Sequence, residues 1–263
     1  MLLVVLLSAP LPLLAQQPEG DSLQRGAAQQ GITIMGDDLS AFMRRVVPSK
    51  PHSTWSVGVL AGVANNSYSI NTLYADNVKY SDKAGFTAGV QCRWHALGWL
   101  ALRADLSLVQ KNNTCVSAIK PRGNTVVQMR NTTNSNYIDL PLMVELSLGQ
   151  RFRVYADGGV YIGYWAWSRV YGESFSMDFL LYDDNDEARF DEPYEFDSRR
   201  DNRFDGGWVA GAGFAVALGD KLSFNAEWRL YYGLTDTQKN YMTFQMPRYN
   251  TTTVFQAGAS WNL

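Results

Sequence analysis

The chain has 263 residues, with 23 Lys plus Arg against 25 Asp plus Glu, and only 18% of its residues are charged. The near balance of charge excludes the basic field of a nucleic-acid-binding protein, and the 46% of apolar residues excludes extensive disorder. Beyond residue 15, no apolar run approaches the roughly 18 residues of a membrane-spanning helix, so a helical membrane protein is excluded as well.

The N-terminal region predicts export. Residues 1–15 are uncharged and apolar and end in the small residue Ala15, as a secretory signal peptide requires, and a buried core helix is the alternative. Residues 16–53 are polar and are predicted to be a periplasmic leader. The leader is expected to be flexible, with docking onto an envelope partner or plugging of the lumen as alternatives.

From Thr54 onward, apolar residues recur at every second position, which a helix cannot place on one face. The clearest run holds six apolar residues of six: Ile138, Leu140, Leu142, Val144, Leu146 and Leu148. Extending the count predicts eight strands, over residues 54–68, 84–97, 99–111, 136–148, 151–168, 206–219, 221–234 and 250–263. Most of these strands are long enough to cross a bilayer, which takes about 9–11 residues.

The predicted connections alternate in length. Three are tight turns that carry glycine, at Leu97-Gly98, Gly149-Gln150 and Gly219-Asp220, and the other four are long. Short turns at one end and long loops at the other are typical of outer-membrane barrels. The sequence therefore predicts an all-β fold: an eight-stranded antiparallel transmembrane β-barrel over residues 54–263, with short periplasmic turns and long extracellular loops, in the cell outer membrane.

The polar faces of the predicted strands carry charges of both signs and almost no lysine. These charges are Arg103, Asp105, Asp139, Glu145, Arg153, Asp157, Glu227 and Arg229. Charges of both signs suit a lumen filled by ion pairs, because buried charges must be paired. Trp94 and Trp99 flank one turn, as an interfacial girdle of aromatic residues requires. A soluble eight-stranded barrel with a ligand cavity is the alternative.

The two cysteines, Cys92 and Cys115, are expected to be free thiols. Cys92 falls on the lipid-facing parity near the periplasm, and Cys115 lies beyond the opposite end of the third strand. Strand rise separates them by about 30 Å, which is too far for a disulfide.

No catalytic residue, cofactor or metal ligand is predicted. The two histidines, His52 and His95, lie before the barrel and beside a periplasmic turn, so neither is expected to reach an extracellular nucleophile. We therefore expect that the chain is not an enzyme.

The third long loop, residues 171–205, is strongly acidic. It holds 12 of the 25 acids: Glu173, Asp178, Asp183, Asp184, Asp186, Glu187, Asp191, Glu192, Glu195, Asp197, Asp201 and Asp205. A solvated surface loop is the first expectation. Residues 183–187 also offer oxygen ligands to a divalent cation that bridges to lipopolysaccharide. Apolar residues just before them offer a partner surface: Phe175, Phe179, Leu180, Leu181 and Tyr182.

Three segments give a family resemblance. Tyr137–Leu142 (YIDLPL) resembles a strand of the PorT-like small outer-membrane β-barrel proteins, and Val154–Tyr164 and Arg203–Asp236 are similar to their next glycine-bearing blocks. The resemblance covers about residues 54–263 and implies an export signal, a closed barrel of about eight strands and no accepted catalytic residue. Proline cannot donate to a strand ladder, and a local bulge is one way to accommodate Pro141.

The predicted function is that of an integral outer-membrane barrel with a side-chain-filled lumen. It is expected to act as a structural or accessory component of the envelope through its loops or leader, for example in a protein-secretion complex. A small channel for ions or solutes is the alternative. The expected partners are outer-membrane lipids and lipopolysaccharide, and envelope proteins that bind residues 16–53 or residues 171–205.

Overall fold

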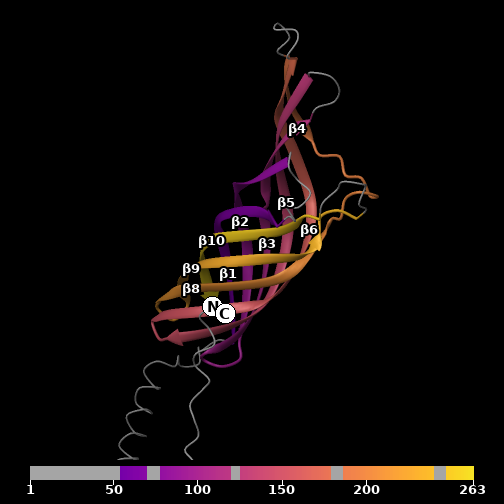
Figure 1. Cartoon of the computed structure of the whole chain (residues 1–263). Coiled ribbons are helices and arrows are strands. Elements are labelled where there is room, and N and C mark those ends of the chain that lie inside the picture. The colour runs from indigo at the N-terminus through magenta and orange to yellow at the C-terminus, as the bar shows by residue number, and fades with distance from the viewer. Residues whose placement is uncertain (1–53, 70–77, 120–124, 179–185, 240–246) are drawn as a thin grey trace, which may run out of the picture. The chain divides into compact units, whose positions relative to one another are not determined.

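The structure is a computed structural model that describes residues 54–69, 78–119, 125–178, 186–239 and 247–263 (Figure 1). These residues form ten β-strands: β1 (Trp55–Ser69), β2 (Val78–His95), β3 (Leu100–Gln110), β4 (Asn112–Ile119), β5 (Thr125–Gly149), β6 (Phe152–Asp178), β7 (Asp186–Pro193), β8 (Phe204–Leu218), β9 (Leu222–Asp236) and β10 (Tyr249–Asn262). Within the described ranges, no helix is both long and apolar enough to cross a bilayer. The predicted signal peptide and leader lie outside the described residues.

Antiparallel pairing links eight of the described strands into a closed series. β1 pairs with both β2 and β10, and the series runs β2–β3–β5–β6–β8–β9–β10. The closing pair of β1 with β10 is continuous from Ser56–Asn262 to Ser69–Tyr249, so β1 has a partner along both of its edges. We call this series the ring. The all-β, antiparallel part of the prediction is confirmed.

One edge of the ring carries the short connections, and we call it the turn edge. Two of its three hairpins turn through glycines with positive φ, Gly149 at 103° and Gly219 at 80°, a backbone conformation that other residues rarely adopt. The third joins His95 to Leu100. All three predicted tight turns are therefore confirmed.

At the opposite edge the predicted strand boundaries are wrong. β5 begins at Thr125 rather than at 136, and β6 continues to Asp178 rather than ending at 168. β4 and β7 occupy segments that were predicted to be loops, so residues 171–178 and 186–193 of the acidic segment form a hairpin of β6 and β7. These segments show no period-two pattern because they bury no continuous apolar face. Backbone pairing and polar side-chain contacts, such as that between the hydroxyls of Thr114 and Thr132, hold them together.

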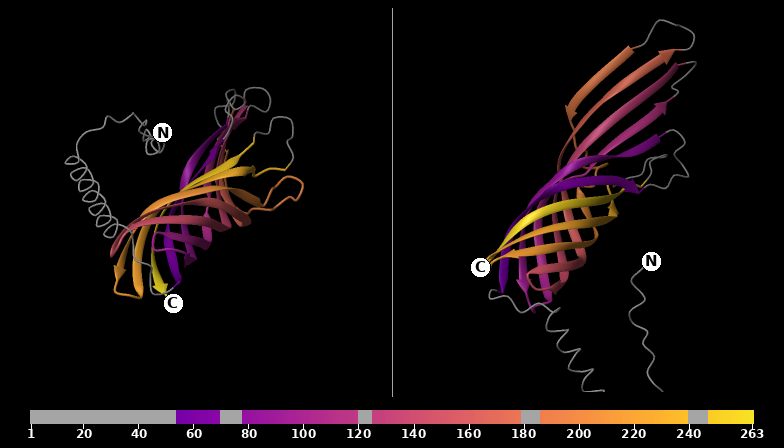
Figure 2. Two further views of the ribbon diagram at one scale, coloured as in Figure 1. Left: turned by 90° about the horizontal axis from the view of Figure 1, so that it is seen from below. Right: turned by 90° about the vertical axis from the view of Figure 1, so that its left-hand side faces the viewer.

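The added strands form a sheet beyond the ring, which we call the extension (Figure 2, right). In it β4 pairs with both β2 and β5, β5 pairs with β6, and β6 pairs with β7. The extension comprises residues 78–83, 112–119, 125–136, 167–178 and 186–193.

Side-chain burial in the ring is inverted relative to a soluble protein. The most thoroughly buried large side chains include Arg103, Arg229 and Lys111, whereas Leu106 is 51% exposed and Val59 is 60% exposed. Apolar residues at every second position therefore point outward, and polar residues point into the ring. The predicted parity of the two faces is confirmed, and such an apolar outer surface suits lipid rather than water.

Many of the exposed aromatic side chains lie toward the two ends of the outer surface, and four more, Phe214, Phe224, Trp228 and Phe255, are distributed elsewhere on it. Near the turn edge the exposed aromatics are Trp55, Trp94, Trp99, Phe152 and Trp261. Toward the extension they are Phe86, Tyr164, Trp167, Phe204, Trp208 and Tyr232. On β6 the aromatics of the two ends are twelve positions apart, from Phe152 to Tyr164, which spans roughly 30 Å for a strand tilted by about 40°. This spacing matches the hydrocarbon layer of a bilayer, and the predicted girdle around Trp94 and Trp99 is confirmed.

Pro141 is accommodated without a bulge. It pairs with Tyr161 of β6, but the ladder between β3 and β5 is interrupted between the pairs Ala104–Leu142 and Ser107–Asp139. The register is the same on both sides of this gap. The missing N–H of proline therefore faces a gap in the ladder, which takes the place of a bulge.

Candidate functional site in the ring interior

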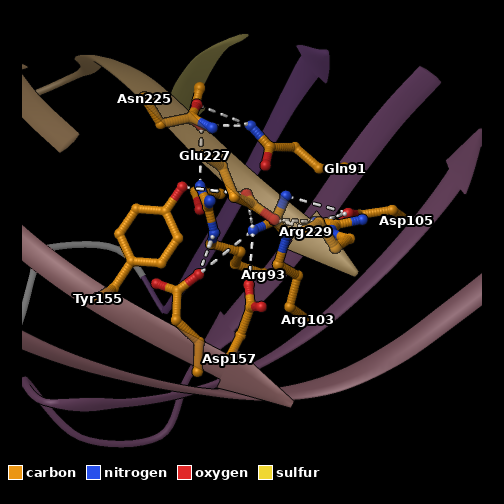
Figure 3. A network of polar contacts seen from close by, with 12 residues as sticks. Gln91, Arg93, Arg103, Asp105, Tyr155, Asp157, Asn225, Glu227 and Arg229 are labelled. Atoms are coloured by element: carbon orange, nitrogen blue, oxygen red, sulfur yellow. Dashed lines mark hydrogen bonds and ion pairs between the residues drawn. The ribbon is translucent and has the colours of Figure 1, made fainter. Parts of the chain in front are cut away.

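The middle of the ring is filled by a network of ion pairs (Figure 3). Arg103 of β3 contacts Asp157 at 3.1 Å and Glu227 at 2.7 Å. Arg229 of β9 contacts Glu227 at 2.6 Å and Asp105 of β3 at 2.9 Å. These bonds cross the interior from one wall to another, so the network both fills the lumen and ties β3, β6 and β9 together.

The contribution of these ion pairs to stability depends on their burial. The side chains of Arg103, Asp105, Asp157, Glu227 and Arg229 are all inaccessible to solvent. Desolvation opposes such pairs, and the loss of one partner leaves an uncompensated buried charge. The stability of the network therefore depends on all of its members.

Seven of the eight predicted lumen charges take part in ion pairs. Asp139 and Glu145 join the five residues of the central network by pairing with Lys111 and Arg93, respectively. The eighth, Arg153, is half-buried beside Glu145 at the turn edge, and no ion pair of the described residues includes it. The predicted paired, filled lumen is confirmed.

Sequence reasoning did not assign Arg93 to the lumen. Its guanidinium donates to Glu145 at 2.8 Å and to the Ser260 hydroxyl at 3.0 Å. Gln91, two positions earlier on β2, donates to the same hydroxyl at 2.7 Å. The signal was present, because both residues have the parity of β2 opposite to that of Val90 and Cys92.

Lys111 closes the interior at its other end. It stands at the break between β3 and β4, is completely buried, and contacts Asp139 at 3.0 Å and Asp205 at 2.7 Å. The rings of Tyr137 and Tyr161 lie 4.5 and 5.0 Å from its ammonium nitrogen, within the range of cation–π attraction. Sequence reasoning placed Lys111 only at the end of a strand. The signal was present, because Lys111 shares the parity of Arg103 and Asp105, which the sequence assigns to the interior.

An aromatic cluster lies beyond Lys111. Trp165 stacks on Tyr137 on one side, with ring centroids 5.8 Å apart, and on Tyr194 on the other, at 5.3 Å. Phe196 packs edge-on against Trp165 at 4.9 Å. Tyr194 and Phe196 belong to the connection from β7 to β8, so this connection returns to the ring and covers its interior.

Asp201 anchors that connection. Burial acts to raise the pKa of its carboxyl group, but hydrogen bonds from the Arg200 guanidinium, the Asp197 backbone N–H and the Tyr194 hydroxyl outweigh it and hold the pKa below the usual 3.8. The carboxylate is therefore ionised at neutral pH and keeps its donors in place. This part of the acidic segment therefore holds the connection against the aromatic cluster and is not a solvated surface loop.

His95 lies inside the turn edge, where its Nε2 is 3.1 Å from the hydroxyl oxygen of Ser56. Ser56, His95 and Glu145 border a cavity of about 10 Å³. Such a cavity has room for about one water molecule and none for a substrate. This histidine–serine pair, which sequence reasoning missed, is therefore not arranged as a catalytic site. His52 lies outside the described residues.

The remaining predicted sites have mixed outcomes. Cys92 and Cys115 are both free, as predicted. Among the described residues, no group of three or more His, Cys, Asp or Glu could hold a metal ion. The predicted cation ligands at 183–185 and the apolar residues at 179–182 lie outside the described residues, and the side chains of Phe175, Asp186 and Glu187 do as well.

Comparisons with known proteins identify the family of the chain. The sequence model of the outer membrane protein beta-barrel domain matches residues 38–239, more than half of the chain. The chain belongs to this family. It is therefore an outer-membrane β-barrel protein, and the predicted localisation is confirmed. A comparison with curated protein sequences gives no match.

Solved structures of outer-membrane proteins are similar at low identity. OprG from Pseudomonas aeruginosa is 11% identical, with a TM-score of 0.39, and the match covers 82% of this chain and 100% of OprG. Neisserial surface protein A is 12% identical, with a TM-score of 0.37 and coverage of 80% and 98%. The outer membrane protease OmpT from Escherichia coli is 6% identical, with a TM-score of 0.36 and coverage of 81% and 97%.

Proposed function

We propose that this protein is an eight-stranded transmembrane barrel of the PorT-like type with a permanently closed lumen, serving the envelope as a structural or accessory component rather than as a channel or an enzyme. In this proposal, residues 1–15 are the export signal, the turn edge faces the periplasm, and the extension stands outside the cell. The observation that carries the proposal is the interior, where three barriers lie in series.

The barriers differ in chemistry. The first is the polar cluster at the turn edge, around Arg93 and Glu145. The second is the buried network of Arg103 and Arg229, and the third is Lys111 under the aromatic cluster. An eight-stranded barrel is only just wide enough to be filled by side chains, so opening a path would require all three barriers to move. This arrangement disfavours the channel alternative.

A barrel that transports nothing must act through its surfaces. Of the extension and the leader, only the extension lies among the described residues. Within it, β6 and β7 pair as a hairpin from Arg169–Pro193 to Ser176–Asp186. We propose that this hairpin presents a docking surface to another envelope protein, such as a component of a secretion complex, and that the leader, residues 16–53, offers a second.

Affinity purification from cross-linked native outer membranes tests the docking proposal. The informative variant replaces residues 170–192 with Asn-Gly, because Arg169 and Pro193 are paired and a two-residue turn can join them. We expect the full chain to recover a stoichiometric outer-membrane or periplasmic partner and the shortened chain to lose it, while both migrate as folded barrels in unheated gels. Absence of any partner, or full retention of the partner by the shortened chain, would overturn the assignment to the hairpin.

A further inference from the structure

The cationic side chains of the extension all lie on one face. Among its described residues these are Lys79, Lys83, Arg130, Arg169 and Arg189. Directly paired residues of antiparallel strands project to the same side, and one continuous row of pairs runs Lys79–Val116–Arg130–Glu173–Arg189. Arg169 pairs with Pro193, which is four residues from Arg189 on β7, so Arg169 and Arg189 lie on the same face. Lys83 also lies on that face, because its side chain contacts Tyr171. We call these five residues the cationic face.

The cationic face continues the lipid-facing surface of the ring. Along β6 the outward side chains are Ile162, Tyr164 and Trp167, each about half exposed, and the next outward residue is Arg169. An irregularity on β6, between the pairs Tyr137–Trp165 and Asn136–Trp167, shifts the alternation by one residue. The register of β2 also changes by one residue, between the pairs Thr87–Val109 and Lys83–Asn112, so that Lys83 and Lys79 share the outward face. The positive charges therefore begin one step beyond the aromatic girdle, at the level where lipid headgroups lie.

Positive charge is in excess on this face. Its two described carboxylates, Asp191 and Glu173, pair with Arg169 at 2.6 Å and with Arg189 at 3.5 Å. Both pairs are largely exposed and are therefore weak. Lys79, Lys83 and Arg130 form no ion pair among the described side chains, and Glu187 also stands in a row of this face, so five cationic positions face three acidic ones.

Two further carboxylates of the extension, Asp82 and Glu192, stand in the alternate rows. Asp82 pairs with Asn113, and Glu192 pairs with Val170. Strand parity thus separates the charges of a segment whose overall composition is acidic. The sequence alone does not reveal this separation of positive from negative charges, because it depends on how the strands pair.

The cationic face is also hollowed. A cavity of about 570 Å³ is bordered by the cations Lys83, Arg130 and Arg189 and by the hydroxyls of Tyr171 and Thr132. The carboxylates Glu173 and Asp191, which pair with Arg189 and Arg169, border it as well. Lys83 is held in place by Tyr171, whose hydroxyl accepts from its ammonium group and whose ring lies 4.7 Å from it. Fixed ammonium and guanidinium groups beside hydroxyls are the usual ligands of phosphate.

We propose that the cationic face binds the phosphate groups of lipopolysaccharide in the surrounding outer leaflet. The ligand is anionic, it occupies the level at which the cations begin, and it approaches from the outward side that they share. Direct binding by cations differs from the alternative that the sequence offered for the acidic segment, in which a divalent cation bridges residues 183–187 to lipopolysaccharide. The inference rests on the outward orientation of the extension proposed above but not on any protein partner.

Binding of purified protein to lipid A tests the proposal. The full chain in zwitterionic detergent is titrated with diphosphoryl lipid A, with enzymatically dephosphorylated lipid A and with inorganic phosphate. The variant Lys83→Gln/Arg130→Gln removes two cations of the face. The matched control, Arg151→Gln/Lys221→Gln, removes two exposed cations at the turn edge and so has the same net charge.

We expect the face variant to bind diphosphoryl lipid A roughly tenfold or more weakly than the wild type, since each cation near an anionic surface contributes measurably. The control should bind like the wild type, and the difference between the variants should vanish with dephosphorylated lipid A. Competition by millimolar inorganic phosphate alone would indicate an unspecific anion site and overturn the lipid assignment. Equal binding by the wild type and the face variant would overturn the proposal. The assay contains no protein partner, so it can fail independently of the docking proposal.

Discussion

Replacing Arg229 with Met should lower the free energy of unfolding by about 3–5 kcal/mol, since truncating one partner of a buried ion pair leaves the other charge uncompensated. Arg229 is completely buried and pairs with both Asp105 and Glu227. Its Nη1 also donates to the Tyr231 hydroxyl at 2.9 Å, and this acceptor would lose its donor as well. The measurement is reversible denaturant unfolding in phospholipid vesicles, followed by tryptophan fluorescence.

Two further variants separate charge from packing. Arg151→Met removes an exposed arginine at the turn edge and should change stability by less than about 0.5 kcal/mol. Arg229→Met leaves Arg103 as the one cation among the described residues that pairs with Asp105, Asp157 and Glu227. Adding Asp105→Asn removes one of the excess negative charges and should recover part of the loss. A cost below about 1 kcal/mol for Arg229→Met would mean that the interior is hydrated and that the network does not fill it.

Replacing Lys111 with Met should cost a similar amount, about 3–5 kcal/mol, because Asp139 and Asp205 would both lose their buried countercharge. Attraction between the ammonium group and the surrounding tyrosine rings would be lost as well. The same unfolding assay measures the effect. Lys221→Met, at an exposed position of the turn edge, is the matched control and should be nearly neutral.

The triple variant Lys111→Met/Asp139→Asn/Asp205→Asn tests the cause. It keeps the shape of the site and removes every charge, so it should be more stable than Lys111→Met alone. If the single variant were as stable as the wild type, Lys111 would not be closing the interior, and the third of the proposed barriers would be absent.

The ring could be predicted from the sequence because one of its faces meets lipid. Contact with lipid on one face requires an apolar residue at every second position, as from Ile138 to Leu148. The same alternation assigns Arg103 and Asp105 to the interior. The glycine turns were predictable for a second reason, which is that positive φ restricts the residue type.

The extension could not be predicted because both of its faces meet polar surroundings. Asn and Thr in β4 and in the first half of β5 satisfy either face, so no period appears and the pairing of the strands decides. The sorting of charges onto the cationic face was missed for a related reason. It depends on register shifts, which move side chains from one face to the other without any signal in the local sequence.

Single-channel recording in planar bilayers tests the central claim, a permanently closed lumen, most directly. The wild-type barrel, inserted at a density confirmed by quantifying the protein in the membrane, should give no conductance steps of porin size at any moderate voltage or between neutral pH and pH 5. Regular ohmic steps of porin size from the wild-type protein would contradict the account, because they would require a continuous water path through the network of Arg103 and Arg229.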